Sequence, residues 1–162
     1  MTWRVFIHRS FNAISPGQVY LPNWHIQAMA YELSRVIAGD TKRLLITLPP
    51  RSLKSICASV ALPAWAIGRD PTKRIICASY SNELTAKHAR DFRTVVLSDW
   101  YRAVFPMARR RKDTETEFVT SKEGYRYGTS VGGTLTGRGG SLIIIDDPLK
   151  PEEAMSKAAR GR

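Results

Sequence analysis

Cysteine is scarce in this chain, which has only Cys57 and Cys77 among its 162 residues. Each lies in an apolar stretch, and the two lack the close spacing of zinc ligands. Two such thiols are too few for a disulfide framework and are typical of proteins from reducing compartments. We therefore expect both cysteines to be free and buried.

Long apolar runs are also missing. No run reaches the roughly 20 residues that a membrane-spanning helix needs, because Pro63 interrupts the best candidate. Residues 1–13 lack the continuous apolar core of a signal peptide. Together these absences predict a soluble, intracellular protein.

Acidic residues are few relative to basic ones, 14 against 25, and the net charge is +11. This excess favours a polyanionic partner, above all nucleic acid, over the alternative of a basic protein without one. Hydrophobic residues make up 43% of the chain, as in a folded domain with a core. The densest basic run, which either contacts phosphate backbones or lies in a solvated loop, includes Arg109, Arg110, Arg111 and Lys112.

One stretch has the layout of a phosphate-binding loop. The apolar run Leu44–Leu48 predicts a buried strand, two prolines end it, and Lys54-Ser55 precedes an apolar helix over 56–67. In such a loop, backbone N–H groups face the phosphates, a lysine adds charge and a hydroxyl ligates magnesium. The nucleotide-binding residues predicted from this stretch are Pro50, Arg51, Ser52, Leu53, Lys54 and Ser55.

The loop departs from the pattern G-x-x-x-x-G-K-[ST], because Leu48 and Leu53 occupy both glycine positions. An ordinary strand–turn–helix with a surface lysine is therefore an equal alternative for this stretch alone. A second motif in the right order is needed to decide between them.

Such a motif follows later in the chain, where the apolar run 141–145 ends in Asp146 and Asp147. Open α/β sheets bind ligands at the carboxyl ends of their strands. One carboxylate there can hold Mg²⁺, and its neighbour can orient or deprotonate the attacking water. The alternative is a plain Asp-Asp-Pro turn after a core strand.

Three further side chains are candidates of lower specificity. Gln27 offers both donor and acceptor to a base, although a solvent-facing helical glutamine fits equally well. His88 is expected to pack at the edge of the core rather than bind a metal. Arg138 lies in a glycine-rich loop and either reaches a phosphate or belongs to a flexible connector.

The expected elements are an extended arm over 1–22, helices over 23–38 and 81–97, a strand over 74–79, a hairpin over 117–127 and a basic helical tail.

With these stretches in order, the chain resembles the large terminase subunit of tailed bacteriophages and prophages, within its N-terminal ATPase domain. Large terminase subunits are ATP-driven motors that package DNA into preformed heads. The resemblance covers about residues 20–160 and rests on five stretches in the right order and spacing, 22–25, 42–55, 78–81, 132–139 and 143–148.

The resemblance implies roles for the residues of both motifs. Lys54 is similar to the phosphate-binding lysine, while Ser55 and Asp146 match the magnesium ligands. Arg51 resembles the loop arginine that stabilises the γ-phosphate. Asp147 stands where the family more often has a glutamate base, which is one methylene longer.

Two matches lie outside the motifs. Gln27 is similar to an adenine contact of the family, and Arg138 to an arginine supplied in trans to the neighbouring subunit of a ring. Leu53 departs from the usual loop glycine. By resemblance, the cofactors are ATP and Mg²⁺, and the partners are double-stranded DNA, the portal protein and the small terminase subunit, in the cytoplasm of a bacterial host.

The implied fold is α/β, a P-loop NTPase of the additional-strand type with a mainly parallel sheet flanked by helices. Residues 1–22 would be an N-terminal arm and residues 23–162 a partial ATPase domain. Full-length relatives continue through a strand that inserts beside the Asp-Asp strand and through a nuclease domain. Because neither occurs in this sequence, the resemblance implies a partial gene product that binds nucleotide weakly and turns over little.

Two alternative functions remain open. A helicase-like nucleic-acid translocase normally keeps the loop glycine and carries Asp-Glu, not Asp-Asp-Pro, after the strand. A non-enzymatic remnant or nucleotide-binding module fits the two leucines in the loop.

Overall fold

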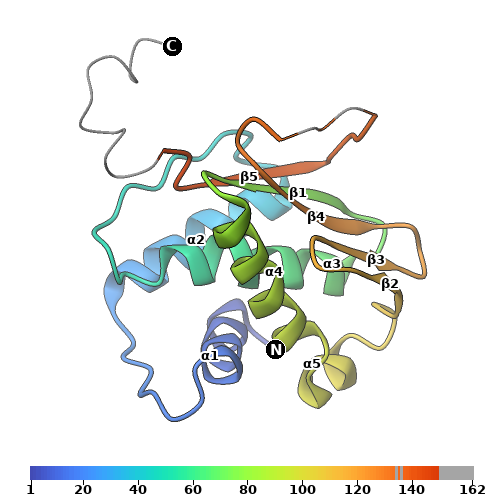
Figure 1. The fold of residues 1–162 in the computed structure, drawn as a ribbon. Helices are drawn as coiled ribbons and strands as arrows, with labels where there is room; N and C mark the ends of the chain where they lie inside the picture. Colours follow the sequence, from blue (N-terminus) through green and yellow to red (C-terminus); the bar gives the residue numbers. More distant parts are fainter. Residues whose placement is uncertain (134, 136, 150–162) are drawn as a thin grey trace, which may run out of the picture.

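Six helical segments and five strands form the part of the chain that the structure describes, residues 1–133, 135 and 137–149. The structure is a computed structural model (Figure 1). In chain order, its elements are α1 (Trp3–Ile14), α2 (Trp24–Ala38), the π-helix η1 (Ile56–Ala61), α3 (Leu62–Arg69), β1 (Arg74–Ser79), α4 (Asn82–Val96), α5 (Asp99–Val104), β2 (Arg110–Asp113), β3 (Glu117–Thr120), β4 (Tyr125–Ser130) and β5 (Leu142–Asp146).

The strands form one open, mixed sheet in the order β2-β3-β4-β1-β5. β1 runs parallel to β4 and β5, whereas β3 is antiparallel to β2 and β4. The predicted α/β class is confirmed, with the parallel part limited to three strands. Ser79 and Asp146 are register partners, so the carboxyl ends of β1 and β5 meet at one edge.

The sheet is covered unequally on its two faces. Helices α1, α3, α4 and α5 lie on one side, below the sheet in Figure 1. On that side Ile75 and Ile144 are buried, whereas Ile143 and Ile145 on the opposite face of the sheet are each 61% exposed. The prediction that the Asp-Asp strand is buried throughout is therefore wrong for alternate residues, since the described helices pack on one face only.

The N-terminal segment is a helix over much of its length, so the expected extended arm is wrong there. Thr2 caps α1, and the buried side chains Trp3, Phe6 and Phe11 recur at helical spacing. The fully buried Phe6 packs edge-on against Trp65 at a ring-centroid distance of 5.1 Å. This segment belongs to the same core as the rest of the chain.

Residues 44–48 form no strand, which contradicts the strand predicted before the phosphate loop. β5 is an edge of the sheet, so the described sheet provides no strand between β5 and this segment. A β-branched apolar run needs a neighbouring strand to pair its N–H and C=O groups. Instead, Leu45 is 87% exposed, while Leu44, Ile46 and Leu48 pack partly against the core.

Most other predicted elements are confirmed. α2 begins after Asn23, whose side chain accepts from the Trp24 N–H, and ends at Gly39 with a left-handed φ of 88°. Ser81 caps α4 through the N–H of Leu84. β1, the β3–β4 hairpin and β5 also occur at the predicted positions. The predicted basic tail lies outside the described residues.

The expectations drawn from the scarce residues can also be compared with the structure. Cys57 and Cys77 are free and buried, as predicted. Burial raises the pKa of Cys57 to about 12, which keeps its thiol protonated. No helix in the described part of the chain is both long and apolar enough to cross a membrane.

Candidate functional site

The two motifs meet, although more than ninety residues separate them in the chain. The Lys54 ammonium donates to Asp147 Oδ1 at 2.6 Å and lies 3.8 Å from Asp146 Oδ1. Asp146 is the last residue of β5 and Asp147 follows it, and the lysine precedes η1, which packs against the sheet. The predicted juxtaposition of Lys54 with the Asp-Asp pair is therefore present.

A groove of about 630 Å³ opens beside this ion pair. The loop forms one wall, and the ends of β1, α4 and β5 contribute the other. Its size is in the range of small-molecule sites. The lining includes all six predicted loop residues, Pro50, Arg51, Ser52, Leu53, Lys54 and Ser55, together with Leu48, Pro49, Ile56, Tyr80, Leu84, Asp147 and Leu149.

The backbone around the groove adopts an unusual conformation. Arg51 has φ 63°, Leu53 has φ 62° and Asp147 has φ 47°. Aspartate tolerates this left-handed region, whereas leucine rarely adopts it. Such conformations cost about 1–3 kcal/mol each and cluster at ligand sites. Leu53 occupies the position of the second loop glycine, so the chain keeps a glycine-like backbone there without the glycine.

This strain leads to a stability prediction at Leu53. Leu53→Gly and Leu53→Ala lose similar packing, but only glycine adopts the left-handed backbone conformation without strain. The Leu53→Gly variant should therefore be more stable than the Leu53→Ala variant by about 1 kcal/mol. Chemical denaturation measures the difference. Leu44 does not have a positive φ, so there the alanine variant should be the more stable of the two, since glycine costs about 0.5–1 kcal/mol relative to alanine. Equal stability of the two Leu53 variants would contradict the strain.

Asp146 lies just beneath the groove and is only 4% exposed. Its Oδ2 accepts a hydrogen bond from Ser59 Oγ at 2.9 Å, and His88 Nε2 lies 3.8 Å from the same oxygen. Burial lowers the pKa of His88, although the charge of Asp146 opposes that shift. His88 is thus a packed histidine at the site, as predicted, and it is in contact with the candidate metal ligand.

Three side chains at this site are of the type that could hold a magnesium ion. Asp146, Asp147 and Ser55 offer two carboxylates and a hydroxyl, the hard donors that Mg²⁺ prefers. Within the described residues, no group of three or more His, Cys, Asp or Glu side chains gathers to hold a metal. An ion here would therefore take few protein ligands and complete its shell with water and phosphate, which is usual for Mg²⁺ at nucleotide sites.

Arg138 is not brought to the groove. Its guanidinium lies 4.0 Å from the ring centroid of Tyr127, and its Nη1 is 2.5 Å from Glu117 Oε1. Hydrogen bonds from Lys112 and Arg138 lower the pKa of Glu117. Through this arginine, the glycine-rich loop contacts β3 and β4.

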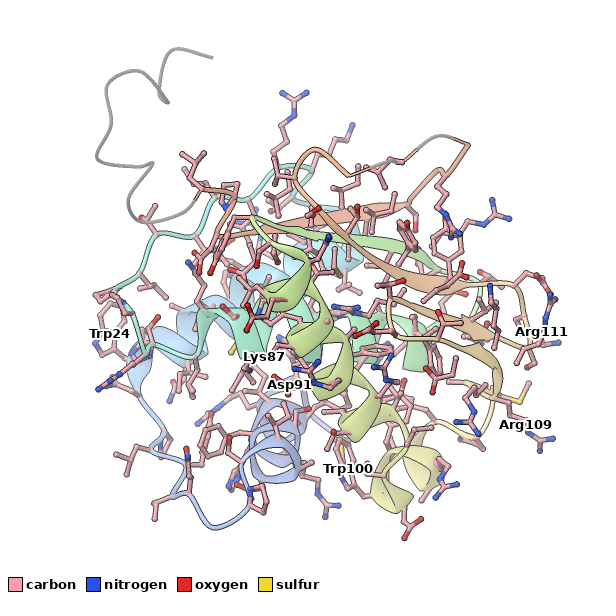
Figure 2. All side chains as sticks on the ribbon, in the orientation of Figure 1. Trp24, Lys87, Asp91, Trp100, Arg109 and Arg111 are labelled. Atoms are coloured by element: carbon pink, nitrogen blue, oxygen red, sulfur yellow. The ribbon has the colours of Figure 1, made fainter. Side chains whose placement is uncertain are left out.

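Two other predicted contacts also lie away from the groove. Gln27 is exposed on α2 and does not line the groove. The basic run is largely strand β2 rather than a loop, and Arg109 and Arg111 extend from that edge (Figure 2). Ion pairs join Arg110 to Asp113, Arg111 to Glu123 and Lys112 to Glu117.

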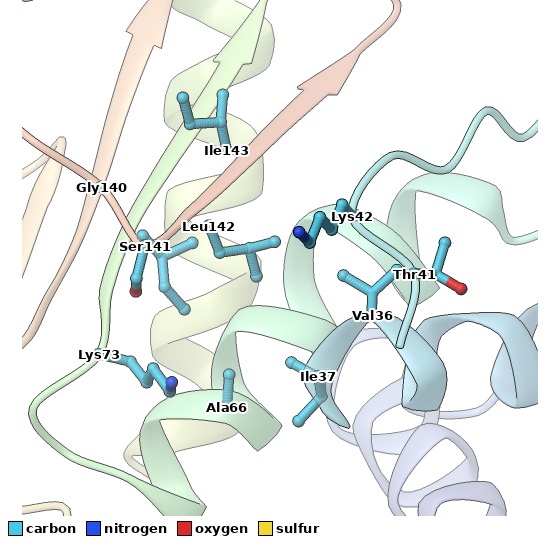
Figure 3. A pocket seen from close by; sticks show the side chains of 11 residues that line it. Val36, Ile37, Thr41, Lys42, Ala66, Lys73, Gly140, Ser141, Leu142 and Ile143 are labelled. Atoms are coloured by element: carbon cyan, nitrogen blue, oxygen red, sulfur yellow. The ribbon is translucent and has the colours of Figure 1, made fainter. Parts of the chain in front are cut away.

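A second cavity, of about 340 Å³, marks the free edge of β5 (Figure 3). Thr41 and Lys42, just after α2, lie on one side, and Ser141, Leu142 and Ile143 lie on the other. This cavity lies between β5 and residues 41–42, which come just before the segment predicted to form a strand. It lies at the amino end of β5, opposite the end that carries Asp146.

Two buried residues near the site, Ser59 and Arg126, were not predicted from the sequence. Ser59 is the polar residue in an otherwise apolar helix, four positions after Ser55, and this isolation was a usable signal. Arg126 is 1% exposed in β4, and alternation alone does not reveal that a charged residue faces the core.

No model of a known protein family matches this chain, and a search of curated proteins finds no significant match. The function proposed below therefore depends on the geometry of the groove and on the resemblance of its motifs.

Proposed function

We propose that the groove binds ATP with Mg²⁺ and hydrolyses it. The observation that supports this most is the contact of Lys54 with both carboxylates at the edge of a loop whose backbone is glycine-like at Leu53. A lysine beside a loop and two acids at a strand end is the arrangement that phosphoryl transfer uses. Without nucleotide, the Lys54 ammonium neutralises the carboxylates of Asp146 and Asp147. A bound triphosphate would compete with these carboxylates for the ammonium.

Each side chain then has a distinct task. Lys54 binds the β- and γ-phosphates, and Arg51 neutralises charge on the γ-phosphate. Asp147 orients a water and accepts its proton as the water oxygen bonds to the γ-phosphorus and the bond to the β-phosphate oxygen breaks. Ser55 and Asp146 would hold magnesium, which supplies charge neutralisation of the phosphate oxygens.

The biological role proposed is that of a DNA-packaging ATPase, by resemblance to large terminase subunits. The net charge of +11 supports a polyanionic partner. Among the described residues, β5 is an edge strand and segment 44–48 joins no sheet. Both features support the additional-strand fold, because one more strand would pair with them. Arg138 would have to leave Glu117 before it could act on a neighbouring subunit.

ATP turnover by the purified chain tests this proposal. Phosphate release, which the resemblance implies is slow for this chain, should require Mg²⁺, rise when double-stranded DNA is added and disappear in Asp146→Asn. Release that persists in EDTA, or in that variant, would contradict it. Nucleotide binding without turnover would favour the non-enzymatic module, and stimulation by single-stranded but not double-stranded DNA would favour a helicase-like translocase.

The proposed binding of DNA makes a separate prediction for the basic run. Replacing Arg109, Arg110, Arg111 and Lys112 with alanine should flatten the slope of log K against log salt by about 0.9 for each phosphate that the run neutralises. Fluorescence anisotropy with duplex DNA measures the slope. A control variant removes four other cations that also form ion pairs with nearby acids, and it should change the slope less; alanine replaces Arg35, Lys73, Lys87 and Arg102. Equal slopes in the wild type and the run variant would assign DNA binding to another surface.

A further inference from the structure

Ser59 has no task in the function proposed so far, yet it contacts the site. It is 1% exposed, and its hydroxyl donates to Asp146 Oδ2 at 2.9 Å. A serine so deeply buried cannot touch a bound nucleotide directly. Any effect that it has on the groove must pass through Asp146.

The two oxygens of Asp146 have different surroundings. Oδ2 faces inward, toward Ser59 Oγ and toward His88 Nε2 at 3.8 Å. Oδ1 is the oxygen on the side of Lys54, whose ammonium lies 3.8 Å away. The carboxylate is thereby held in one orientation, with one oxygen turned into the protein and the other turned toward the loop.

The helix that carries Ser59 is itself irregular at this point. η1 is a π-helix, in which the Leu62 N–H donates to the C=O of Cys57, five residues back. Such turns are rare and occur frequently at functional sites. Arg126, 1% exposed and 5.2 Å from the Phe92 ring centroid, directs Nη2 toward the C=O of Ser59 at 3.5 Å. A buried cation thus lies against the turn that presents the serine.

We propose that Ser59 is a positioning residue for Asp146: its hydroxyl holds Oδ2 so that Oδ1 is presented to the magnesium of a bound nucleotide beside Lys54. This role rests on the proposed nucleotide site, whereas the contact between Ser59 and Asp146 does not. Because the serine acts on the metal ligand alone, its loss should weaken metal-dependent binding and spare the contacts that Lys54 and the loop make with phosphate.

Binding of a fluorescent ATP analogue to Ser59→Ala, with Mg²⁺ and with EDTA, tests this role. With Mg²⁺ the affinity should fall about 10-fold, the effect of losing a hydrogen bond to a charged group. With EDTA it should equal that of the wild type. Ser10→Ala is the matched control, because Ser10 is equally buried and its hydroxyl has no partner in the described part of the chain. Ser59→Thr keeps the hydroxyl, whereas Ser59→Val has the shape of threonine without it. The threonine variant should therefore bind the analogue more tightly with Mg²⁺ than the valine variant does.

Equal losses with Mg²⁺ and with EDTA, or no loss in either, would overturn the positioning role. If the wild type itself shows no magnesium-dependent binding, the proposed function fails, and unfolding then tests the contact alone. Ser59→Ala should destabilise the wild type but have little effect in Asp146→Ala, because that variant has no side-chain acceptor for the serine hydroxyl. Additive effects in this cycle would overturn the contact and the inference with it.

Discussion

Replacing Lys54 with alanine should lower the affinity for Mg²⁺-ATP by at least about 30-fold, because the bound phosphate would lose the cation that pairs with it, a loss of about 2 kcal/mol or more. The loss is enlarged by the neighbouring acids. Without the ammonium, Asp146 and Asp147 are left facing the triphosphate and repel it. Isothermal titration with a non-hydrolysable analogue measures the change, and circular dichroism confirms the fold.

Lys87→Ala is the matched control for this variant. Lys87 forms an ion pair with Asp91 on α4 at 2.6 Å, the same distance as the Lys54–Asp147 pair, and it does not line the groove (Figure 2). Its replacement removes the same charge and should leave the affinity within about twofold. If both variants bind like the wild type, the loop is not the phosphate site.

Asp147→Asn should lower the rate of ATP hydrolysis by about 10²- to 10⁴-fold, the usual contribution of a general base. Affinity should hold or rise, because the substitution releases Lys54 from its 2.6 Å ion pair and leaves it free for phosphate. Asparagine is the right replacement, since it tolerates the φ of 47° at this position as aspartate does. Steady-state kinetics and titration separate the two effects.

The variant Asp147→Glu also tests the role of Asp147 as the base, because it keeps a carboxylate at this position. The variant should therefore retain far more hydrolysis than Asp147→Asn. A fall in affinity and rate together in Asp147→Asn would instead mean that Asp147 holds the nucleotide. That result would remove its assignment as the base.

Local chemistry was enough to predict the meeting of Lys54 with Asp146 and Asp147. Both motifs have a fixed place on an α/β sheet, the turn before a helix and the carboxyl end of a strand. The starts of α2 and α4 could be predicted from the capping residues Asn23 and Ser81. Capping is also local, because the side chain bonds to a backbone N–H one to three residues away.

Other features depended on distant partners and could not be read from local sequence. Residues 44–48 have strand composition but no neighbouring strand, and composition cannot supply one. In the sequence Arg138 is a lone cation in a glycine-rich loop, yet Tyr127 and Glu117 bind it from β4 and β3. The N-terminal helix shows spacing that could have been recognised, since Trp3, Phe6 and Phe11 recur on one face.

The most direct test of the nucleotide site is to map where a nucleotide binds. Amide chemical shifts of the ¹⁵N-labelled wild-type chain should be followed as a non-hydrolysable ATP analogue is added with Mg²⁺. The largest changes should fall on residues 51–56 and on Asp146 and Asp147, and they should vanish in Lys54→Ala. Changes centred on the cavity between Lys42 and Leu142, or no changes at saturating nucleotide, would contradict the assignment of this groove as an ATP site.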